Sequence, residues 1–198
     1  MKISAVIALI AANTAVYLLQ WQFNDAMEVL FALWPWQAID GPSNFHVWQI
    51  VTYSFLHSTE DVSHLLLNMV GLWVFGTFIE RSEGPWRLLA CYIASVITAA
   101  LTLLLLPAAI GGPPAPAIGA SGGVFGLLLA CALMSPKSEV LYFLISIPLW
   151  LFAMVFAGIE LFKGLTGREP GVGHFGHLGG MVGSALVVMR WRAKRRVR

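Results

Sequence analysis

Residues 86–106 read WRLLACYIASVITAALTLLLL, an apolar run in which Arg87 is the only charged residue. A helix needs about 20 apolar residues to cross the hydrocarbon core of a bilayer, and this run has that length. Five similar runs occur elsewhere in the chain, separated by more polar connections. The sequence therefore predicts a protein built from membrane-spanning helices.

Six spans account for most of the 198 residues and leave no room for a soluble domain. The predicted spans are residues 3–20, 62–79, 86–106, 118–134, 140–162 and 172–189. Because five further runs follow the first, residues 3–20 are interpreted as a membrane helix and not as a secretory signal. Residues 1–198 are thus predicted to form one all-α integral membrane domain, a six-transmembrane-helix bundle.

The composition excludes several other classes of protein. Hydrophobic residues make up 58% of the chain and charged residues 11%, whereas a soluble domain has about 25% charged residues. A disordered chain or a nucleic-acid-binding protein would also need more charge. Cys91 and Cys131 lie inside apolar runs, so neither a disulfide framework nor a cysteine metal site is indicated. No cofactor or metal is predicted, and the expected surrounding is the lipid bilayer.

Lysine and arginine residues set the direction of the chain, because cytoplasmic loops carry the excess of both. With the N-terminus inside, only Lys163 and Arg168 fall on the outer side. The inner side holds Lys2, Arg81, Arg87, Lys137, Arg190, Arg192, Lys194, Arg195, Arg196 and Arg198. Both termini are therefore predicted to be cytoplasmic, and the basic tail 190–198 is interpreted as an anchor at anionic lipid headgroups.

The connection 21–61 is the longest segment outside the predicted spans. It contains Trp21, Trp34, Trp36 and Trp48 but no lysine or arginine. Tryptophan side chains favour the membrane interface, so this segment is predicted to rest in the outer interface. A loop that is merely tucked against the helices is an equally good interpretation.

Polar side chains inside hydrocarbon are costly and indicate function, and here they fall at one depth. Spans two, four and six all start from the outer side, and their polar residues come early in each. With a rise of 1.5 Å per residue, these residues lie roughly 3 to 10 Å below the outer boundary. The layer consists of His64 and Asn68 on span two, Ser121 on span four and His177, preceded by His174, on span six.

Glycines indicate which spans touch, because small residues four apart let helix backbones approach closely in lipid. Span four opens with Gly119-Ala120-Ser121-Gly122-Gly123, followed by Gly126. Span six contains Gly173, Gly176, Gly179, Gly180 and Gly183. The two spans are predicted to contact each other, which would bring Ser121 within about 2.6 to 3.2 Å of an imidazole on span six. The alternative is that these glycines only pack helices.

This layer could support nucleophilic catalysis. An imidazole can accept the proton of a serine hydroxyl, and attack on an amide builds an oxyanion that needs fixed donors. His64 and Asn68 share one helix face, and the first-turn N–H of Ser121 lacks an intrahelical partner. Each residue also has a simpler interpretation: a serine bonded to its own helix, polar contacts between helices, or metal or haem ligands at His174 and His177.

The motifs, taken in order, resemble the rhomboid family of intramembrane serine proteases over about residues 48–183. The resemblance rests on WQIVTYSFLH at 48–57, HLLLN at 64–68, ERSEG at 80–84, GASG at 119–122 and HLGG at 177–180. It implies an endopeptidase with a Ser-His dyad that works through an acyl-enzyme. Ser121 would be the nucleophile and His177, followed by Leu-Gly-Gly, the general base.

The resemblance also implies an oxyanion hole formed by His64, Asn68 and the Ser121 N–H. Gly119, Gly122, Phe125 and Gly180 would support the site, with Phe125 where the family often has a tyrosine under the histidine. Segment 21–61 would be a partly embedded loop. Span 140–162 would be a mobile helix near the route of the substrate, with Pro148 available as a kink. Expected substrates are transmembrane proteins cut near the outer surface, commonly after a small residue.

Two alternatives to a protease are compatible with the sequence. The first is a catalytically inactive rhomboid-like protein that binds transmembrane segments, and the second is a haem- or metal-binding membrane protein that uses His64, His174 and His177. Zinc and aspartyl intramembrane proteases are disfavoured, because the sequence has no HExxH motif and no aspartate in any span. The brevity of the chain suggests a prokaryotic plasma membrane, with the site opening to the extracytoplasmic side.

Overall fold

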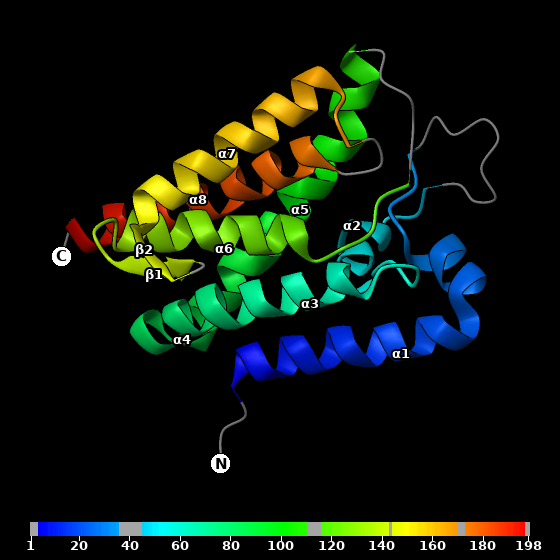
Figure 1. Cartoon of the computed structure of the whole chain (residues 1–198), viewed down its shortest axis with the longest axis horizontal. Coiled ribbons are helices and arrows are strands. Elements are labelled where there is room, and N and C mark those ends of the chain that lie inside the picture. The colour runs from blue at the N-terminus through cyan, green and yellow to red at the C-terminus, as the bar shows by residue number, and fades with distance from the viewer. Residues whose placement is uncertain (1–3, 36–44, 111–115, 143, 170–172, 197–198) are drawn as a thin grey trace.

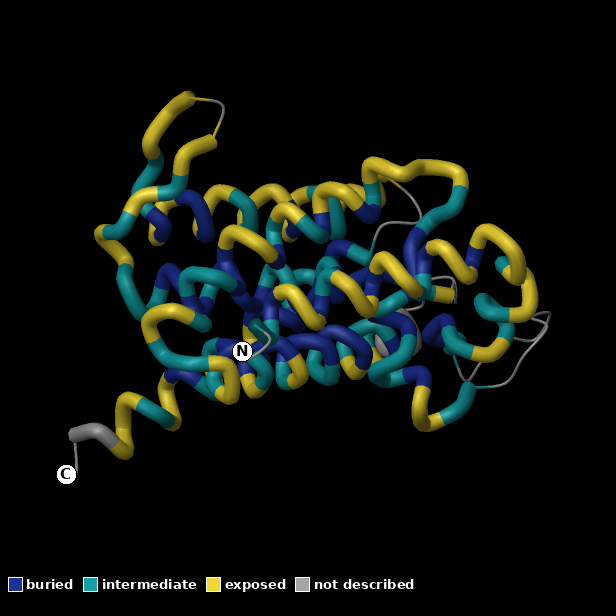
Figure 2. The backbone as a smooth tube through the Cα atoms, turned by 90° about the horizontal axis from the view of Figure 1, so that it is seen from below, coloured by how far each residue is buried: buried dark blue, intermediate teal, exposed yellow. Residues whose placement is uncertain are grey.

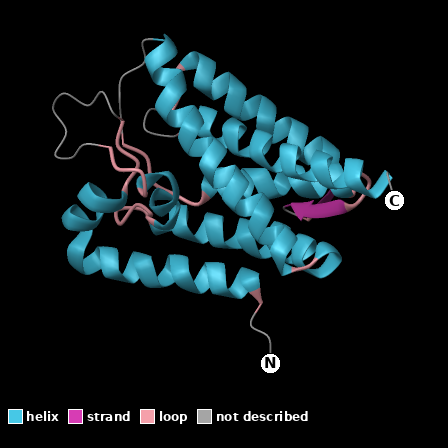
Figure 3. Cartoon of the chain, turned by 180° about the vertical axis from the view of Figure 1, so that it is seen from behind, coloured by secondary structure: helices cyan, strands magenta, loops and turns pink. Residues whose placement is uncertain are grey.

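The central helices of the bundle are α5 (Pro85–Ile110), α6 (Ser121–Met134) and α8 (His174–Arg196), which pack against one another pairwise. The computed structural model describes residues 4–35, 45–110, 116–142, 144–169 and 173–196. On one side of these helices lie α3 (Val62–Gly71) and α1 (Ala5–Phe31), and on the other lies α7 (Leu149–Thr166) (Figure 1). Helices dominate the chain, as Figure 3 shows.

The second predicted span is one continuous rod made of three helical segments. After α3 comes η2 (Leu72–Gly76), a single π-helical turn, and then α4 (Thr77–Glu83). Gly84 ends the rod with φ +89°, a conformation that glycine adopts without steric cost. Pro85 begins α5 directly afterwards, in a position where the missing N–H of proline costs no helical hydrogen bond.

The N-terminus of α1 is capped by a carboxylate from α4. Glu80 accepts hydrogen bonds from the Ser4 hydroxyl at 2.5 Å and from the Ala5 N–H at 2.6 Å. The Ala5 N–H is among the donors that a helix leaves unpaired at its start, and the helix dipole favours a negative charge there. Glu80 therefore ties the first helix to the end of the second rod.

Two of the predicted boundaries need correction. Helix α1 continues to Phe31, with a kink at Phe23, so the predicted loop 21–61 begins as helix. Helix α8 continues to Arg196, so most of the basic tail 190–198 is helical. In both places the helix continues into a stretch that is less apolar than a membrane span. Hydropathy alone therefore does not reveal where the helix ends. Lys2, Trp36, Val172 and Arg198 lie outside the described residues.

The largest correction concerns the predicted helix 140–162. Its first part is a β-hairpin of strands β1 (Glu139–Tyr142) and β2 (Ile145–Pro148), which pair antiparallel with Glu139 opposite Pro148. Branched and aromatic side chains favour strands, and the residue before a proline avoids helical geometry. Pro148 is the residue before α7 and has ψ 135°, so it starts this helix and does not kink it.

Segment 45–61 is fastened to the bundle by buried side chains. It contains two short helices, α2 (Gln49–Thr52) and η1 (Tyr53–Phe55). The Gln20 amide of α1 donates to the His57 carbonyl at 3.0 Å and accepts from the His57 N–H at 2.9 Å. The Gln49 side chain is fully buried and donates to Leu30 O at 3.4 Å. The described part of the loop is thus tucked against the helices.

The outer surface of the bundle is apolar, as expected for an integral membrane protein. Among the described residues, four helical segments are long and apolar enough to cross a membrane: Ala5–Phe31, Val62–Glu83, Pro85–Leu106 and Leu149–Thr166. Large side chains point outward, with Leu67 71% and Trp86 81% exposed. Figure 2 shows exposed residues along the outside of the helices and buried ones between them. The start of α1 and the end of α8 lie at the same end of the bundle (Figure 1).

Candidate active site

Ser121 is the first residue of α6, and the turn before the helix places it there. Gly119 has φ +120°, a conformation that other residues rarely adopt. Its N–H donates to Tyr53 O at 2.9 Å, and the Tyr53 hydroxyl donates to Val96 O of α5 at 2.9 Å. Since Ser121 lies in the first turn, its backbone N–H needs a partner from outside the helix.

His177 of α8 is directed at Ser121. The distance between His177 Nε2 and Ser121 Oγ is 2.7 Å, inside the range expected from the sequence. Phe125, one turn after Ser121, stacks on the imidazole with ring centroids 4.4 Å apart and planes 3° apart. The structure therefore brings together one serine and one histidine from neighbouring helices, and that histidine is His177 and not His174.

Glycines allow α6 and α8 to approach closely enough for this contact. A Cβ on Gly180 would overlap the carbonyl oxygen of Gly122, and a Cβ on Gly126 would stand 2.7 Å from Gly180 O. The predicted contact between these two helices is confirmed. Gly179 and Gly183, by contrast, face threonine side chains of α5, so the glycines of α8 serve two different neighbours.

We expect Gly180→Ala to lower turnover of a membrane-anchored reporter at least about 100-fold, because the added methyl group must push α6 and α8 apart and a shift of about 1 Å can cost that much. The matched control is Gly158→Ala in α7, where a Cβ would meet nothing within 4 Å. Cleavage rates of both variants in liposomes check this. Wild-type turnover in Gly180→Ala would show that the close approach is dispensable.

Glu160 of α7 is the residue that sequence reasoning missed at this site. Its Oε2 atom lies 2.7 Å from His177 Nδ1 and 2.7 Å from His174 Nδ1. The resemblance implied a dyad without an acid, so this contact departs from expectation. A signal was present in the sequence, since a carboxylate within an apolar run requires a partner. The spacing along the chain, however, does not reveal which helix supplies that partner.

Within the described part of the chain, Glu160, His174 and His177 also form a cluster that could hold a metal ion, because their ligand atoms all lie within 4.8 Å of one another. Zinc would need each atom at about 2.0 to 2.2 Å and both histidine nitrogens unprotonated. Separations of 2.7 Å between Oε2 and each Nδ1 suit charge-assisted hydrogen bonds. We therefore interpret this cluster as hydrogen-bonded.

His64 reaches the site from α3. The Ser58 N–H donates to His64 Nδ1 at 3.3 Å, so a neutral His64 carries its proton on Nε2. A Cβ on Gly119 would stand 2.8 Å from this Nε2 and 3.7 Å from Ser121 Oγ, which places the donor beside the serine. Asn68 lies one turn later, but its amide nitrogen donates to His64 O at 2.8 Å. One of the two side-chain N–H groups of Asn68 is therefore used within its own helix.

His46 and His57 of the outer segment are not part of the Ser121–His177 pair. His46 stacks on Trp48, with ring centroids 4.4 Å apart. His57 is fully buried, and burial lowers the pKa of its imidazole to about 4, with a smaller contribution from the neighbouring His64. The His57 ring lies 5.1 Å from the His64 ring, so it packs behind the site.

The depressed pKa of His57 predicts a loss of stability in mild acid. Because the unfolded pKa is about 6.5 and the folded pKa about 4, the contribution is complete above pH 6.5 and falls as the pH drops toward 4, by about 3 kcal/mol at most. Thermal unfolding in detergent at pH 7.5 and pH 5 should show a smaller shift for His57→Gln than for the wild type. Equal shifts would contradict the assignment.

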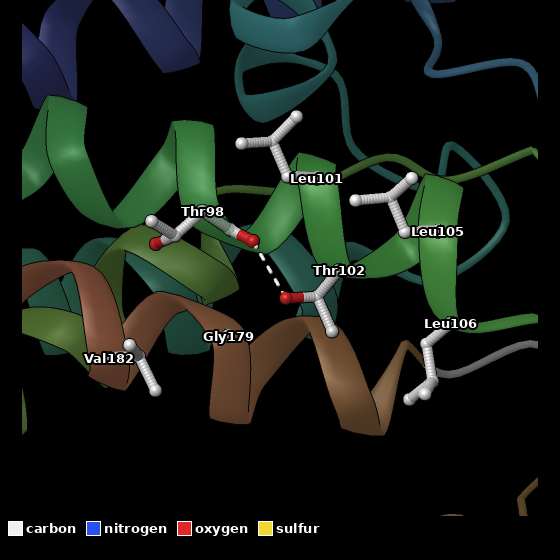
Figure 4. A pocket seen from close by; sticks show the side chains of 7 residues that line it. All are labelled: Thr98, Leu101, Thr102, Leu105, Leu106, Gly179 and Val182. Carbon is white, nitrogen blue, oxygen red and sulfur yellow. Dashed lines mark hydrogen bonds between the residues drawn. The ribbon is translucent and has the colours of Figure 1, made fainter. Parts of the chain in front are cut away.

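A cavity of about 400 Å³ lies elsewhere, between α5 and α8. It is lined by Thr98, Leu101, Thr102, Leu105, Leu106, Gly179 and Val182 (Figure 4). The Thr102 hydroxyl donates a hydrogen bond to the Thr98 carbonyl oxygen at 2.8 Å (Figure 4). The lining is mainly apolar and includes neither Ser121 nor His177, so this cavity is not part of the candidate site.

The amino-acid sequence is similar to those of several known proteins. Residues 44–193 match the Rhomboid domain. The chain is 27% identical to RHOMBOID-like protein 12, mitochondrial, of Arabidopsis thaliana over 96% of its own length and 59% of that protein. It is 29% identical to Rhomboid protease GluP of Bacillus subtilis (strain 168), over 69% of its length and 24% of that protein. It is also 29% identical to Inactive RHOMBOID-like protein 8 of Arabidopsis thaliana, over 74% of its length and 38% of that protein.

These similarities cover more than the site motifs. The chain spans about three fifths of the mitochondrial relative and a quarter of the bacterial one. Because similar proteins are named for mitochondria and chloroplasts, they do not support the predicted prokaryotic plasma membrane. The family match covers most of the chain, including all the helices that carry the site, and this integral membrane protein belongs to the rhomboid family.

Proposed function

We propose that this chain is an intramembrane serine endopeptidase in which Ser121 is the nucleophile and His177 the general base. The observation that carries the proposal is the 2.7 Å separation of Ser121 Oγ and His177 Nε2. A serine hydroxyl bonded to an imidazole that is itself oriented by a third group has the geometry of an activated nucleophile. Here the Glu160 carboxylate contacts the other ring nitrogen of His177.

The reaction follows from the positions of these groups. Ser121 Oγ attacks the carbonyl carbon of the scissile peptide while its proton passes to His177 Nε2. The tetrahedral intermediate collapses when the same proton is given to the leaving amine, which leaves an acyl-enzyme on Ser121. Water then attacks this ester, again with His177 as base. The cycle returns the serine and the neutral imidazole unchanged.

Donors for the oxyanion surround the serine. His64 Nε2 on α3 and Ser121 Oγ both lie close to Gly119, and the first-turn N–H of Ser121 adds a second donor at the start of α6. Asn68 remains the third proposed donor, with one amide N–H beyond the bond it makes to His64 O. Fixed donors in a site of low dielectric stabilise the developing charge strongly.

The length of α6 supports a site below the membrane surface. Its 14 residues extend about 21 Å, whereas the hydrocarbon core is about 30 Å thick. If the C-terminal end of α6 reaches one boundary, Ser121 lies roughly 9 Å inside the other. We propose six spans, with the apolar start of α8 as the sixth, and both termini on the cytoplasmic side, in agreement with their position at one end of the bundle.

The proposed substrates are membrane-anchored proteins cut within or near their transmembrane segment. A substrate helix must unwind at the cleavage point, because in an intact helix the carbonyl groups are held in hydrogen bonds. The half-exposed Trp48 belongs to segment 45–61, which would face the outer interface. Membership of the rhomboid family leads us to expect cleavage after a small residue.

A second candidate function is supported by one of the relatives. Since one similar protein is named inactive, a rhomboid-like fold without cleavage is a real alternative. In that case this chain would bind transmembrane segments and leave them intact. The Ser121–His177 contact favours the protease, because nothing in mere binding requires it.

The test is cleavage of single-span reporters by the purified chain in liposomes. A panel with a small residue near the outer boundary should yield two fragments, with a new N-terminus inside or next to the span. Reporter binding without any cleavage across the panel, and without reaction of Ser121 with a fluorophosphonate, would favour the inactive candidate.

A further inference from the structure

Glu160 is placed to act on both histidines of α8 at once. Its side chain is 9% exposed, and the side chains of His174 and His177 are 6% and 12% exposed. One carboxylate oxygen stands 2.7 Å from Nδ1 of each ring. A buried carboxylate is strongly unfavourable unless it is paired and hydrogen-bonded, so these two contacts account for its presence.

The hydrogen-bond partners of His174 indicate which of its ring nitrogens carry a proton. Its Nδ1 faces Glu160, and its Nε2 lies 3.0 Å from the carbonyl oxygen of Arg168. A carbonyl oxygen can only accept, and so can an ionised carboxylate, so a His174 ring that bonds both as a donor from each nitrogen is the charged partner of an ionised Glu160. Glu160 and His174 therefore form an ion pair between α7 and α8.

The same reasoning fixes the state of His177. Its Nδ1 must carry a proton to bond Glu160, which leaves the Nε2 lone pair for the hydroxyl proton of Ser121. The stacked Phe125 holds the plane of the ring. Without an acceptor at Nδ1, the ring could carry its proton on Nε2 instead, and then it could not act as a base.

We propose that Glu160 is a positioning carboxylate for the general base: it holds His177 in the Nδ1–H tautomer and stabilises the imidazolium formed when Ser121 loses its proton, while His174 holds Glu160 in place. This role deepens the proposed function and rests on it. It turns the expected dyad into a chain of four groups, Ser121, His177, Glu160 and His174. In serine proteases a carboxylate in this position fixes the histidine in the same way.

The experiment measures kcat and KM of reporter cleavage for the wild type and Glu160→Gln, normalised to the fraction of Ser121 that a fluorophosphonate labels after prolonged reaction. A glutamine can place its carbonyl oxygen where Oε2 faces both imidazole N–H groups, but it lacks the negative charge that stabilises the imidazolium of His177. We expect kcat to fall about 100-fold or more, with KM nearly unchanged, because the lost interaction is made in the transition state. The matched control is Glu139→Gln in β1, at the other end of the bundle, which should keep wild-type kcat.

Glu160→Asp keeps the negative charge, and its kcat should be at least ten-fold higher than that of Glu160→Gln. It also serves as the informative variant if Glu160→Gln does not fold, in which case a kcat lowered about ten-fold from wild type at unchanged KM is expected. A purely structural bond between α7 and α8 would lower thermal stability and leave the normalised kcat alone. Normalised kcat within two-fold of wild type in Glu160→Gln, or in Glu160→Asp if only that variant folds, would overturn the role of Glu160 alone. Absence of Ser121 labelling and cleavage in the wild type would overturn the proposed function itself.

Discussion

Replacing Ser121 by alanine should abolish cleavage of a membrane-anchored reporter, with a loss of at least about 10⁴-fold in kcat. The hydroxyl is the group that attacks, and the alanine methyl cannot form an acyl-enzyme. Ser121 is the first residue of α6 and is only partly buried. Removing its hydroxyl therefore leaves no large cavity and should not unfold the bundle. Fragment formation in liposomes, measured beside thermal unfolding of the same sample, separates loss of chemistry from loss of fold.

Ser63→Ala provides the matched control, since this exposed hydroxyl on α3 bonds only to the nearby Asp61 among the described residues. It should retain wild-type turnover. Turnover persisting in Ser121→Ala would mean that another group attacks the peptide, and the assignment of the nucleophile would be wrong.

Replacing His177 by alanine should have an effect of similar size, although Ser121 remains in place. Without Nε2 beside it, the hydroxyl has no acceptor for its proton and is a weak nucleophile at neutral pH. In a serine protease the loss of either member of the pair costs about as much as the loss of both, so the double variant should be no slower than either single one. Initial rates for the two single variants and the double variant test this non-additivity.

His46→Ala is the control for removing an imidazole outside the site, since His46 stacks on Trp48 in segment 45–61. Its turnover should stay within a few-fold of wild type. Additive losses in the Ser121 and His177 variants would indicate that the two residues act separately.

Much of the site could be predicted from the sequence because the membrane simplifies the problem. Polar side chains are costly in hydrocarbon, so the few that occur mark a site, and the rise of a helix converts position into depth. This argument places Ser121 and His177 at one level, and Gly122 and Gly180 indicate that their helices touch. The structure confirms both the contact and the distance.

Glu160 could not be placed in the same way. Its partner lies 17 residues further along the chain, across a turn, and which face of α7 meets α8 depends on packing that hydropathy does not encode. The hairpin of β1 and β2 was missed for a related reason, because an apolar run of branched residues is compatible with a strand or with a helix. Pro148 would have been the better guide, since helices avoid the residue before a proline.

The most direct test is the reaction of a fluorophosphonate with the wild-type chain, followed by peptide mass spectrometry. The account predicts a single phosphonyl adduct on Ser121, formed in the wild type and reduced at least about 100-fold in rate in His177→Ala, because labelling needs a serine activated by that imidazole. No adduct on Ser121, or labelling of Ser121 at the same rate after His177 is removed, would contradict the claim that these two side chains form the reactive pair.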